Sequence, residues 1–196
     1  MSSDVSSEPT IHELLRERRS HYAFDPERAV SADDLHALLE AARWTMSSFN
    51  AQPWRYIVGV RERSQETWDS IFDAVVEPNQ PWARNAPVLI LTAVEHQFEH
   101  NGKPNKAAVH DLGAASASMT FEATARGLTV HQMIGIDPDR ARETFDVLGS
   151  LEPYTAIAIG YQGDDSVIPE KYAERQKMPR SRKALDELVI AGSIGE

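Results

Sequence analysis

The spacing of hydrophobic residues predicts three elements with clear boundaries. Hydrophobic side chains recur at helical intervals between residues 35 and 42, and Ser31 stands where the N-cap of such a helix is expected. Residues 87–93 form an aliphatic run without polar alternation, which is typical of a strand buried on both faces. Residues 107–126 are apolar nearly all round and rich in Ala, Gly and Ser, which favours a buried helix that Gly127 ends.

Weaker signals predict the other elements and the fold class. Thr10 and Glu13 have the spacing of a capping box, at the start of a helix that runs to Ser20. Asp137 followed by Pro138 is typical of another helix start. The remaining expectations are a helix over residues 64–76, an extended or irregular segment at 128–136, and strands at 56–60 and 155–161. Because helices and strands alternate unevenly, the sequence predicts an α+β fold, with residues 1–9 as a disordered tail and residues 10–196 as a single domain.

Composition narrows the possible chemistry. The chain has 196 residues and no cysteine, which excludes disulfides, thiolate metal sites and Fe–S clusters, so a redox protein of this sequence must carry its electrons on a bound cofactor. A net charge of −10 disfavours nucleic acid and anionic membranes as partners. The N-terminus is polar and acidic, and the longest apolar run, residues 86–94, is too short to span a bilayer. We therefore expect a cytoplasmic protein.

Two Arg-Ser clusters and one polar loop are candidates for binding. Each cluster, at residues 18–20 and 180–183, could be a solvated basic surface, but together they could hold one phosphate monoester against the overall charge. The loop over residues 47–54 concentrates hydroxyls, amides and aromatic rings that could bind a flat heterocycle. It could equally be a connection anchored by Trp54.

The order of these motifs resembles that of the nitroreductase family over nearly the whole chain after Thr10. The family pattern Arg-Arg-Ser-x-Arg-x-Phe is similar to residues 18–24, and Pro-Ser-Ser-x-Asn-x-Gln-Pro-Trp is similar to residues 46–54. Further matching segments are residues 86–90, 111–115, 127–128, 131–135, 160–161 and 182–185. Each motif alone is weak, and their shared order and spacing carry the resemblance.

The resemblance implies a fold, an assembly and a cofactor site. The fold has three layers with a central mixed β-sheet flanked by helices, and two chains form an intertwined homodimer with two FMN sites at the interface. The matching positions are Arg18, Arg19, Ser20, Arg180 and Arg182 for the phosphate and ribityl chain, Ser47, Ser48 and Asn50 for a loop from the other subunit, and Asn79, Gln132, Met133, Ile134 and Gly135 for the flavin ring.

The resemblance also implies a reaction. Hydride would pass from NADH or NADPH through flavin N5 to a small electrophilic acceptor, such as a nitroaromatic or a quinone, in ping-pong turnover. No side chain is assigned as a general acid or base, because the flavin carries the chemistry. No Gly-x-Gly-x-x-Gly follows a predicted strand, which fits a nicotinamide that visits the flavin and leaves.

Two positions depart from the family pattern. Tyr22 stands at a flavin-site position where the family usually has Arg or Lys, so a cation that would stabilise the anionic reduced flavin is missing there. Met46 stands where the family usually has Pro, which loosens the start of the polar loop. These departures bear on the redox potential and on the wall of the pocket.

Two alternative functions remain open at this point. His96, Glu99 and His100 match the inverted zinc-peptidase motif His-x-x-Glu-His, which needs both histidines on one helical face. Residues 101–104 would stop such a helix at once, which disfavours zinc chemistry. The other alternative is a flavin-binding relative with different chemistry, such as dehalogenation or ring oxidation, or a flavin protein without reductase turnover.

Overall fold

A four-stranded antiparallel sheet forms the centre of the computed structural model, which describes residues 11–192. In spatial order its strands are β1 (Trp54–Val60), β2 (Val88–Glu95), β4 (Leu151–Gly160) and β3 (Thr129–Met133). The α+β class is confirmed, whereas the expected mixed sheet is corrected, because every strand pair within the described residues is antiparallel. Val60 lies opposite Val88, so the connection between β1 and β2 leaves and re-enters the sheet at the same end and reverses the strand direction.

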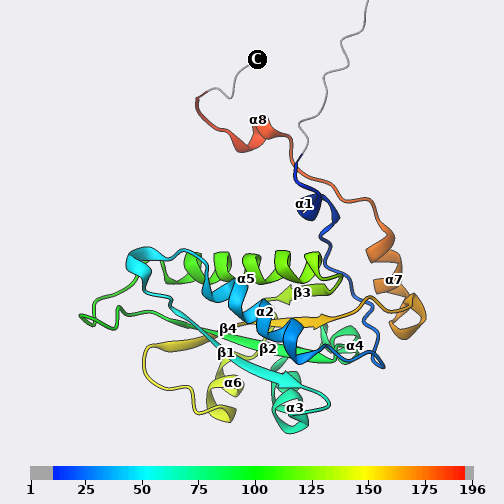
Figure 1. The fold of residues 1–196 in the computed structure, drawn as a ribbon, viewed down its shortest axis with the longest axis horizontal. Helices are drawn as coiled ribbons and strands as arrows, with labels where there is room; N and C mark the ends of the chain where they lie inside the picture. Colours follow the sequence, from blue (N-terminus) through cyan, green and yellow to red (C-terminus); the bar gives the residue numbers. More distant parts are fainter. Residues whose placement is uncertain (1–10, 193–196) are drawn as a thin grey trace, which may run out of the picture.

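Helices cover both faces of the sheet, which confirms the three layers (Figure 1). On one face lie α2 (Ala32–Arg43) and α5 (Ala108–Ala125), and on the other lie α3 (Gln65–Ala74), α4 (Gln80–Ala83) and α6 (Pro138–Thr144). β2 is buried on both sides: Leu89 and Leu91 join the core with α3, whereas Val88 and Ile90 join the core with α5. The aliphatic run predicted as a buried strand is therefore confirmed.

Three of the predicted capping residues lie at the helix ends where the sequence places them. The Ser31 hydroxyl accepts a hydrogen bond from the Asp34 amide at 3.0 Å and starts α2. Asp137 caps α6 in the same way, with its carboxylate accepting from the Arg140 amide at 3.0 Å. Gly127 follows α5 with a φ of +71°, the left-handed conformation expected of a residue that ends a helix.

The long helix α5 buries one face rather than its whole surface. Leu112, Ala115 and Met119 pack against the sheet, whereas Val109 and Gly113 on the other side are exposed. The prediction of a helix buried all round is thus corrected for the isolated chain. The isolated chain therefore leaves part of the apolar surface of α5 open to solvent.

Several boundaries differ from the expectations. α1 (Glu13–Glu17) is a single short helix capped by His12, whose Nδ1 accepts from the Leu14 amide at 3.2 Å. It ends because Arg18 adopts an extended conformation, so the helix predicted to reach Ser20 is too long. Thr10 and the tail expected at residues 1–9 lie outside the described residues. β1 starts two residues and β4 four residues earlier than predicted.

The remaining elements lie at the edges of the body. These are the 3₁₀ turns η1 (Ser48–Asn50) and η2 (Asp165–Val167), and the helices α7 (Glu170–Lys177) and α8 (Leu185–Leu188). Figure 1 shows α1 and α8 standing off the α5 side of the molecule, away from the sheet. None of the helices within residues 11–192 has the length and hydropathy needed to cross a membrane.

Candidate functional site

Segments from the two ends of the chain enclose a cleft of about 230 Å³, here called the arginine cleft. Its lining residues are Arg18, Arg19, Ser20, Tyr22, Arg175, Gln176, Met178, Arg180 and Arg182. Five of these nine residues are arginines and none is acidic. In a protein with a net charge of −10, such a local concentration of guanidinium groups is suited to an anion with several oxygens, such as a phosphate.

Hydrogen bonds join the two segments of the arginine cleft. One Nη of Arg180 donates to the carbonyl oxygen of Arg18 at 2.8 Å, and the other donates to the carbonyl oxygen of Arg16. Nη1 of Arg18 donates to the hydroxyl of Ser20 at 3.3 Å. Burial, followed by the positive charges of Arg180 and Arg182, lowers the pKa of Arg18 below its usual value. The guanidinium groups therefore repel one another, and a bound anion would relieve that repulsion.

Two side chains fix α7 beside the cleft. Oε1 of Gln176 accepts from the amides of Tyr22 at 2.9 Å and Ala23 at 3.3 Å. The hydroxyl of Tyr172, whose ring is buried, donates to the carbonyl oxygen of Pro78. These bonds hold α7 between the segment after Arg19 and the loop before α4.

A larger hollow of about 410 Å³, here called the Gln132 cavity, adjoins the arginine cleft and shares Tyr22 and Arg175 with it. Its lining residues are Tyr22, Pro78, Asn79, His131, Gln132, Met133, Ile134, Gly135, Tyr172 and Arg175. Asn79 packs so closely on Gly135 that a Cβ added to this glycine would lie 2.6 Å from Nδ2 of Asn79. The structure therefore brings Asn79 together with residues 132–135, as the family pattern implied.

A third hollow, of about 260 Å³, connects these two along α5. Its lining residues are Arg18, Ser20, Ala117, Thr120, Phe121, Val130 and Gln132. Nε2 of Gln132 donates to the hydroxyl of Thr120 at 2.8 Å and to the carbonyl oxygen of Ser116 at 3.1 Å, which holds this side chain against the helix. The third hollow shares Arg18 and Ser20 with the arginine cleft and Gln132 with the Gln132 cavity, so the three hollows adjoin one another.

The rings of Tyr22, His131 and Trp82 form an aromatic cluster beside the Gln132 cavity. The His131 ring packs against both Tyr22 and Trp82, with centroid distances of 4.7 Å and 4.3 Å, and its Nδ1 is 2.9 Å from the carbonyl oxygen of His21. Burial lowers the pKa of His131, and the charge of Arg175 acts in the same direction. The imidazole is therefore neutral at pH 7, although its bond to His21 opposes the shift.

The lowered pKa of His131 predicts a stability that declines in mild acid. Below the unfolded pKa of about 6.5 the unfolded chain takes up a proton that the folded chain does not, so the free energy of unfolding falls as the pH drops. We expect His131→Gln to reduce this slope, which for one proton is at most about 1.4 kcal/mol per pH unit. Urea unfolding between pH 7 and pH 5 measures it. The same substitution at His100, which is exposed and forms no ion pair within residues 11–192, is the control, and equal slopes in both variants would contradict the prediction.

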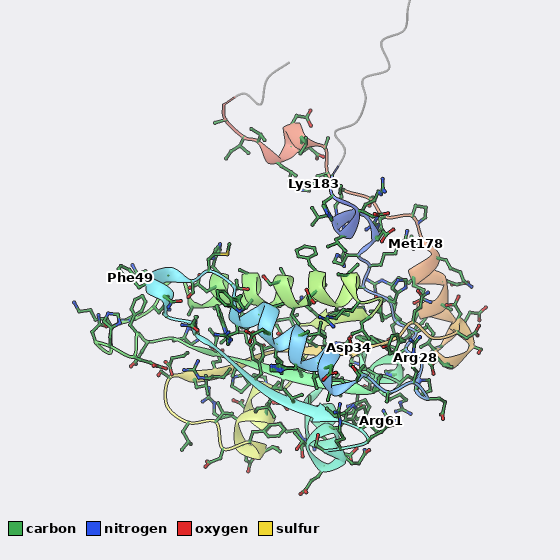
Figure 2. All side chains as sticks on the ribbon, viewed as in Figure 1. Arg28, Asp34, Phe49, Arg61, Met178 and Lys183 are labelled. Carbon is green, nitrogen blue, oxygen red and sulfur yellow. The ribbon has the colours of Figure 1, made fainter. Side chains whose placement is uncertain are left out.

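Ser47, Ser48 and Asn50 line none of these hollows. The Ser48 amide donates to Oδ2 of Asp111 at 2.9 Å, which places the loop at the N-terminal end of α5. Thr120, in the third hollow, lies about 14 Å further along that helix. Figure 2 shows Phe49, whose side chain is 86% exposed, at one end of α5 and Met178 beyond the other. The sequence-predicted site residues therefore fall into two groups at opposite ends of one helix.

The sequence profile of the nitroreductase family matches residues 15–161. The chain belongs to this family. The major NAD(P)H-flavin oxidoreductase of Aliivibrio fischeri is 28% identical over 220 aligned positions, which cover 92% of this chain and 97% of that protein. A crystal structure described as an oxidoreductase containing FMN superposes with a TM-score of 0.87 and 31% identity, covering 100% of this chain and 98% of that one.

A third comparison includes a bound cofactor. A protein from Desulfovibrio desulfuricans, assigned as a nitroreductase and solved in complex with FMN, superposes with a TM-score of 0.70 and 25% identity. The match covers 95% of this chain and all of that chain. The nitroreductase fold read from the sequence motifs is thus confirmed by solved structures.

The structure contradicts the zinc-peptidase alternative. Residues 96–104 form a loop closed by a bridge between Gln97 and Pro104, rather than the helix that the motif requires. His96 is 2.5 Å from a carboxylate oxygen of Glu152, and Glu99 accepts from Arg55 at 2.5 Å. Two of the three residues expected as metal ligand or base are thus engaged elsewhere.

Three lining residues on α7 were missing from the family-based prediction: Tyr172, Arg175 and Gln176. The sequence feature that could have identified these residues is their spacing, because residues three and four apart lie on one face of a helix. The sequence showed only a short helix somewhere in the C-terminal segment. Without its bounds, that shared face could not be assigned.

Proposed function

We propose that this nitroreductase-family protein is an FMN-dependent oxidoreductase that uses NADH or NADPH. The observation that carries the proposal is the junction of the arginine cleft with the Gln132 cavity, which share Tyr22 and Arg175. A cationic pocket that opens into a larger, mostly uncharged cavity fits a molecule with a phosphate at one end and a flat ring at the other. The FMN-containing relatives and the NAD(P)H-flavin oxidoreductase of Aliivibrio fischeri support the same assignment.

Each part of the region would hold a different part of FMN. Arg18, Ser20, Arg180 and Arg182 would bind the phosphate through charge-assisted hydrogen bonds, with Arg19 beside them. Asn79 and residues 132–135 would border the ring, and the Gln132 side chain is already fixed by α5. When bound, FMN accepts hydride from NAD(P)H and passes it to an electrophile. The protein positions the ring and sets the surrounding charge.

The second half of the site would come from another copy of the chain. In one subunit the loop at residues 47–50 is far from the arginine cleft, while an apolar face of α5 and hydrophobic side chains of α1 and α8 are exposed. The exposed residues on α1 and α8 are Leu15, Leu185 and Leu188. A two-fold dimer that buries these surfaces would carry the loop of each chain to the cleft of the other. We therefore propose a homodimer with two shared sites.

The open side of the Gln132 cavity would serve both substrates in turn. Its lining is uncharged apart from Arg175, which suits a nicotinamide and a small electrophilic acceptor such as a nitroaromatic or a quinone. If both bind at the same place, the nicotinamide must leave before the acceptor arrives, which gives ping-pong kinetics.

The spectrum of the purified protein tests this function. We expect flavin absorption bands that bleach on anaerobic addition of NADH or NADPH, and that return on addition of a quinone or nitroaromatic acceptor. Released cofactor should be FMN, because the arginine cleft is built for one terminal phosphate. A colourless protein that takes up no FMN, or flavin bands that both nucleotides leave unchanged, would contradict the proposal. The latter result would favour a family relative with different chemistry.

A further inference from the structure

Arg175 lies where the arginine cleft meets the Gln132 cavity, and it lines both. Its guanidinium carbon is 5.8 Å from the centroid of the Tyr22 ring, within the range of a cation–π contact. Gln176, the next residue, is bonded to the Tyr22 amide, and Tyr172, three residues earlier, is buried and bonded to Pro78. The backbone that carries Arg175 is therefore held firmly beside Tyr22.

The charge of Arg175 is the dominant one in the Gln132 cavity. Among the ten lining residues it is the only Arg, Lys, Asp or Glu. Within residues 11–192, no carboxylate lies within 4.0 Å of its guanidinium nitrogens to neutralise it. His131, the other titratable ring near Tyr22, is uncharged at pH 7 because burial lowers its pKa, and the field of Arg175 contributes to that shift.

Tyr22 carries no charge, lines both hollows and offers an aromatic face on which the Arg175 guanidinium can rest. We propose that Arg175 supplies the positive charge of the Gln132 cavity from α7, and that this charge stabilises the anionic reduced flavin there. The inference rests on the proposed function, since it requires FMN to bind there. Arg175 is thus assigned as the residue that sets the redox potential of the site.

The midpoint potential of bound FMN separates this role from simple phosphate binding. A contact to the phosphate strengthens binding of oxidised and reduced FMN equally and leaves the potential unchanged. A cation near the ring favours the reduced anion and raises the potential. We expect Arg175→Gln to weaken binding of reduced FMN about tenfold more than that of oxidised FMN, which lowers the two-electron midpoint potential by about 30 mV.

Two matched variants make the result specific. Lys171→Gln removes one positive charge from the same helix, at a residue that lies over the Tyr172 ring and lines neither hollow, so the potential should fall by much less than in Arg175→Gln. Arg175→Lys keeps the positive charge, so the midpoint potential of bound FMN should stay close to the wild-type value. The Arg175 side chain is exposed and donates no hydrogen bond within residues 11–192, so folding should be preserved, which thermal unfolding verifies.

The outcomes distinguish the inference from the function on which it rests. An unchanged potential in an FMN-loaded Arg175→Gln variant would overturn the role of Arg175 and leave the oxidoreductase assignment intact. An equal fall in the Lys171→Gln variant would also overturn it, because it would show an effect of overall charge. If the wild-type protein binds no FMN, the proposed function fails first.

Discussion

A mixture of Arg18→Ala and Asn50→Asp chains, refolded together, is expected to recover about a quarter of the wild-type FMN sites. Arg18 lies in the arginine cleft, and Asn50 lies on the loop at the opposite end of α5. If each site takes these residues from different chains, a mixed dimer has one doubly damaged site and one intact site. Random pairing makes half of the dimers mixed, so about one site in four is intact.

The experiment refolds the two variants together and measures FMN bound per chain at a concentration that saturates only the wild type. Asn50→Asp is chosen because Asn50 has a φ of +52°, which Asp tolerates better than Ala, so the loop should keep its conformation. Each variant refolded alone is the control and should bind little FMN. If verified mixed dimers also bind little, or if the protein is a monomer, the shared site is wrong.

Arg182→Ala is expected to raise the dissociation constant of FMN by about 10- to 150-fold. A hydrogen bond to a charged group contributes about 1.5–3 kcal/mol, and each 1.4 kcal/mol corresponds to a factor of ten. Arg182 lines the arginine cleft and its charge helps to lower the pKa of Arg18, which shows that the two guanidinium groups interact.

Lys183→Ala is the matched control, because it removes the same charge from the adjacent residue, which does not line the cleft. A solvated lysine contributes little to binding, so the dissociation constant of FMN from the Lys183→Ala variant should stay within a few-fold of the wild-type value. Fluorescence titration with FMN measures both. Similar dissociation constants for the two variants would remove Arg182 from the phosphate site.

Elements that leave a clear pattern along the sequence were predicted correctly. β2 is aliphatic on both faces because a helix layer covers each side, and Ser31 and Asp137 cap their helices through their own side chains. The first four residues of β4 were missed, and they include Pro153, a residue type that is uncommon inside strands. The structure accommodates it opposite Ala93, where a register shift interrupts the regular pairing with β2.

Contacts between residues far apart in the chain could not be predicted, because they leave no pattern among neighbouring residues. Family motifs indicated Arg18 and Arg180, and the structure brings them to one cleft across a separation of 162 residues. No motif marked Arg175, because its importance depends on where α7 docks, and that is decided by the contacts of Gln176 and Tyr172 with distant segments. The division of the site residues along α5 likewise became visible only in three dimensions.

The four-stranded sheet and the two cores that cover it lie within residues 11–192 of one chain. All four strands and both helix layers belong to the same subunit, so this body can form in a unimolecular step. A site built from both ends of α5 needs a second, bimolecular step before FMN finds all of its contacts. Recovery of flavin binding after dilution from denaturant should then depend on protein concentration, while recovery of secondary structure should not.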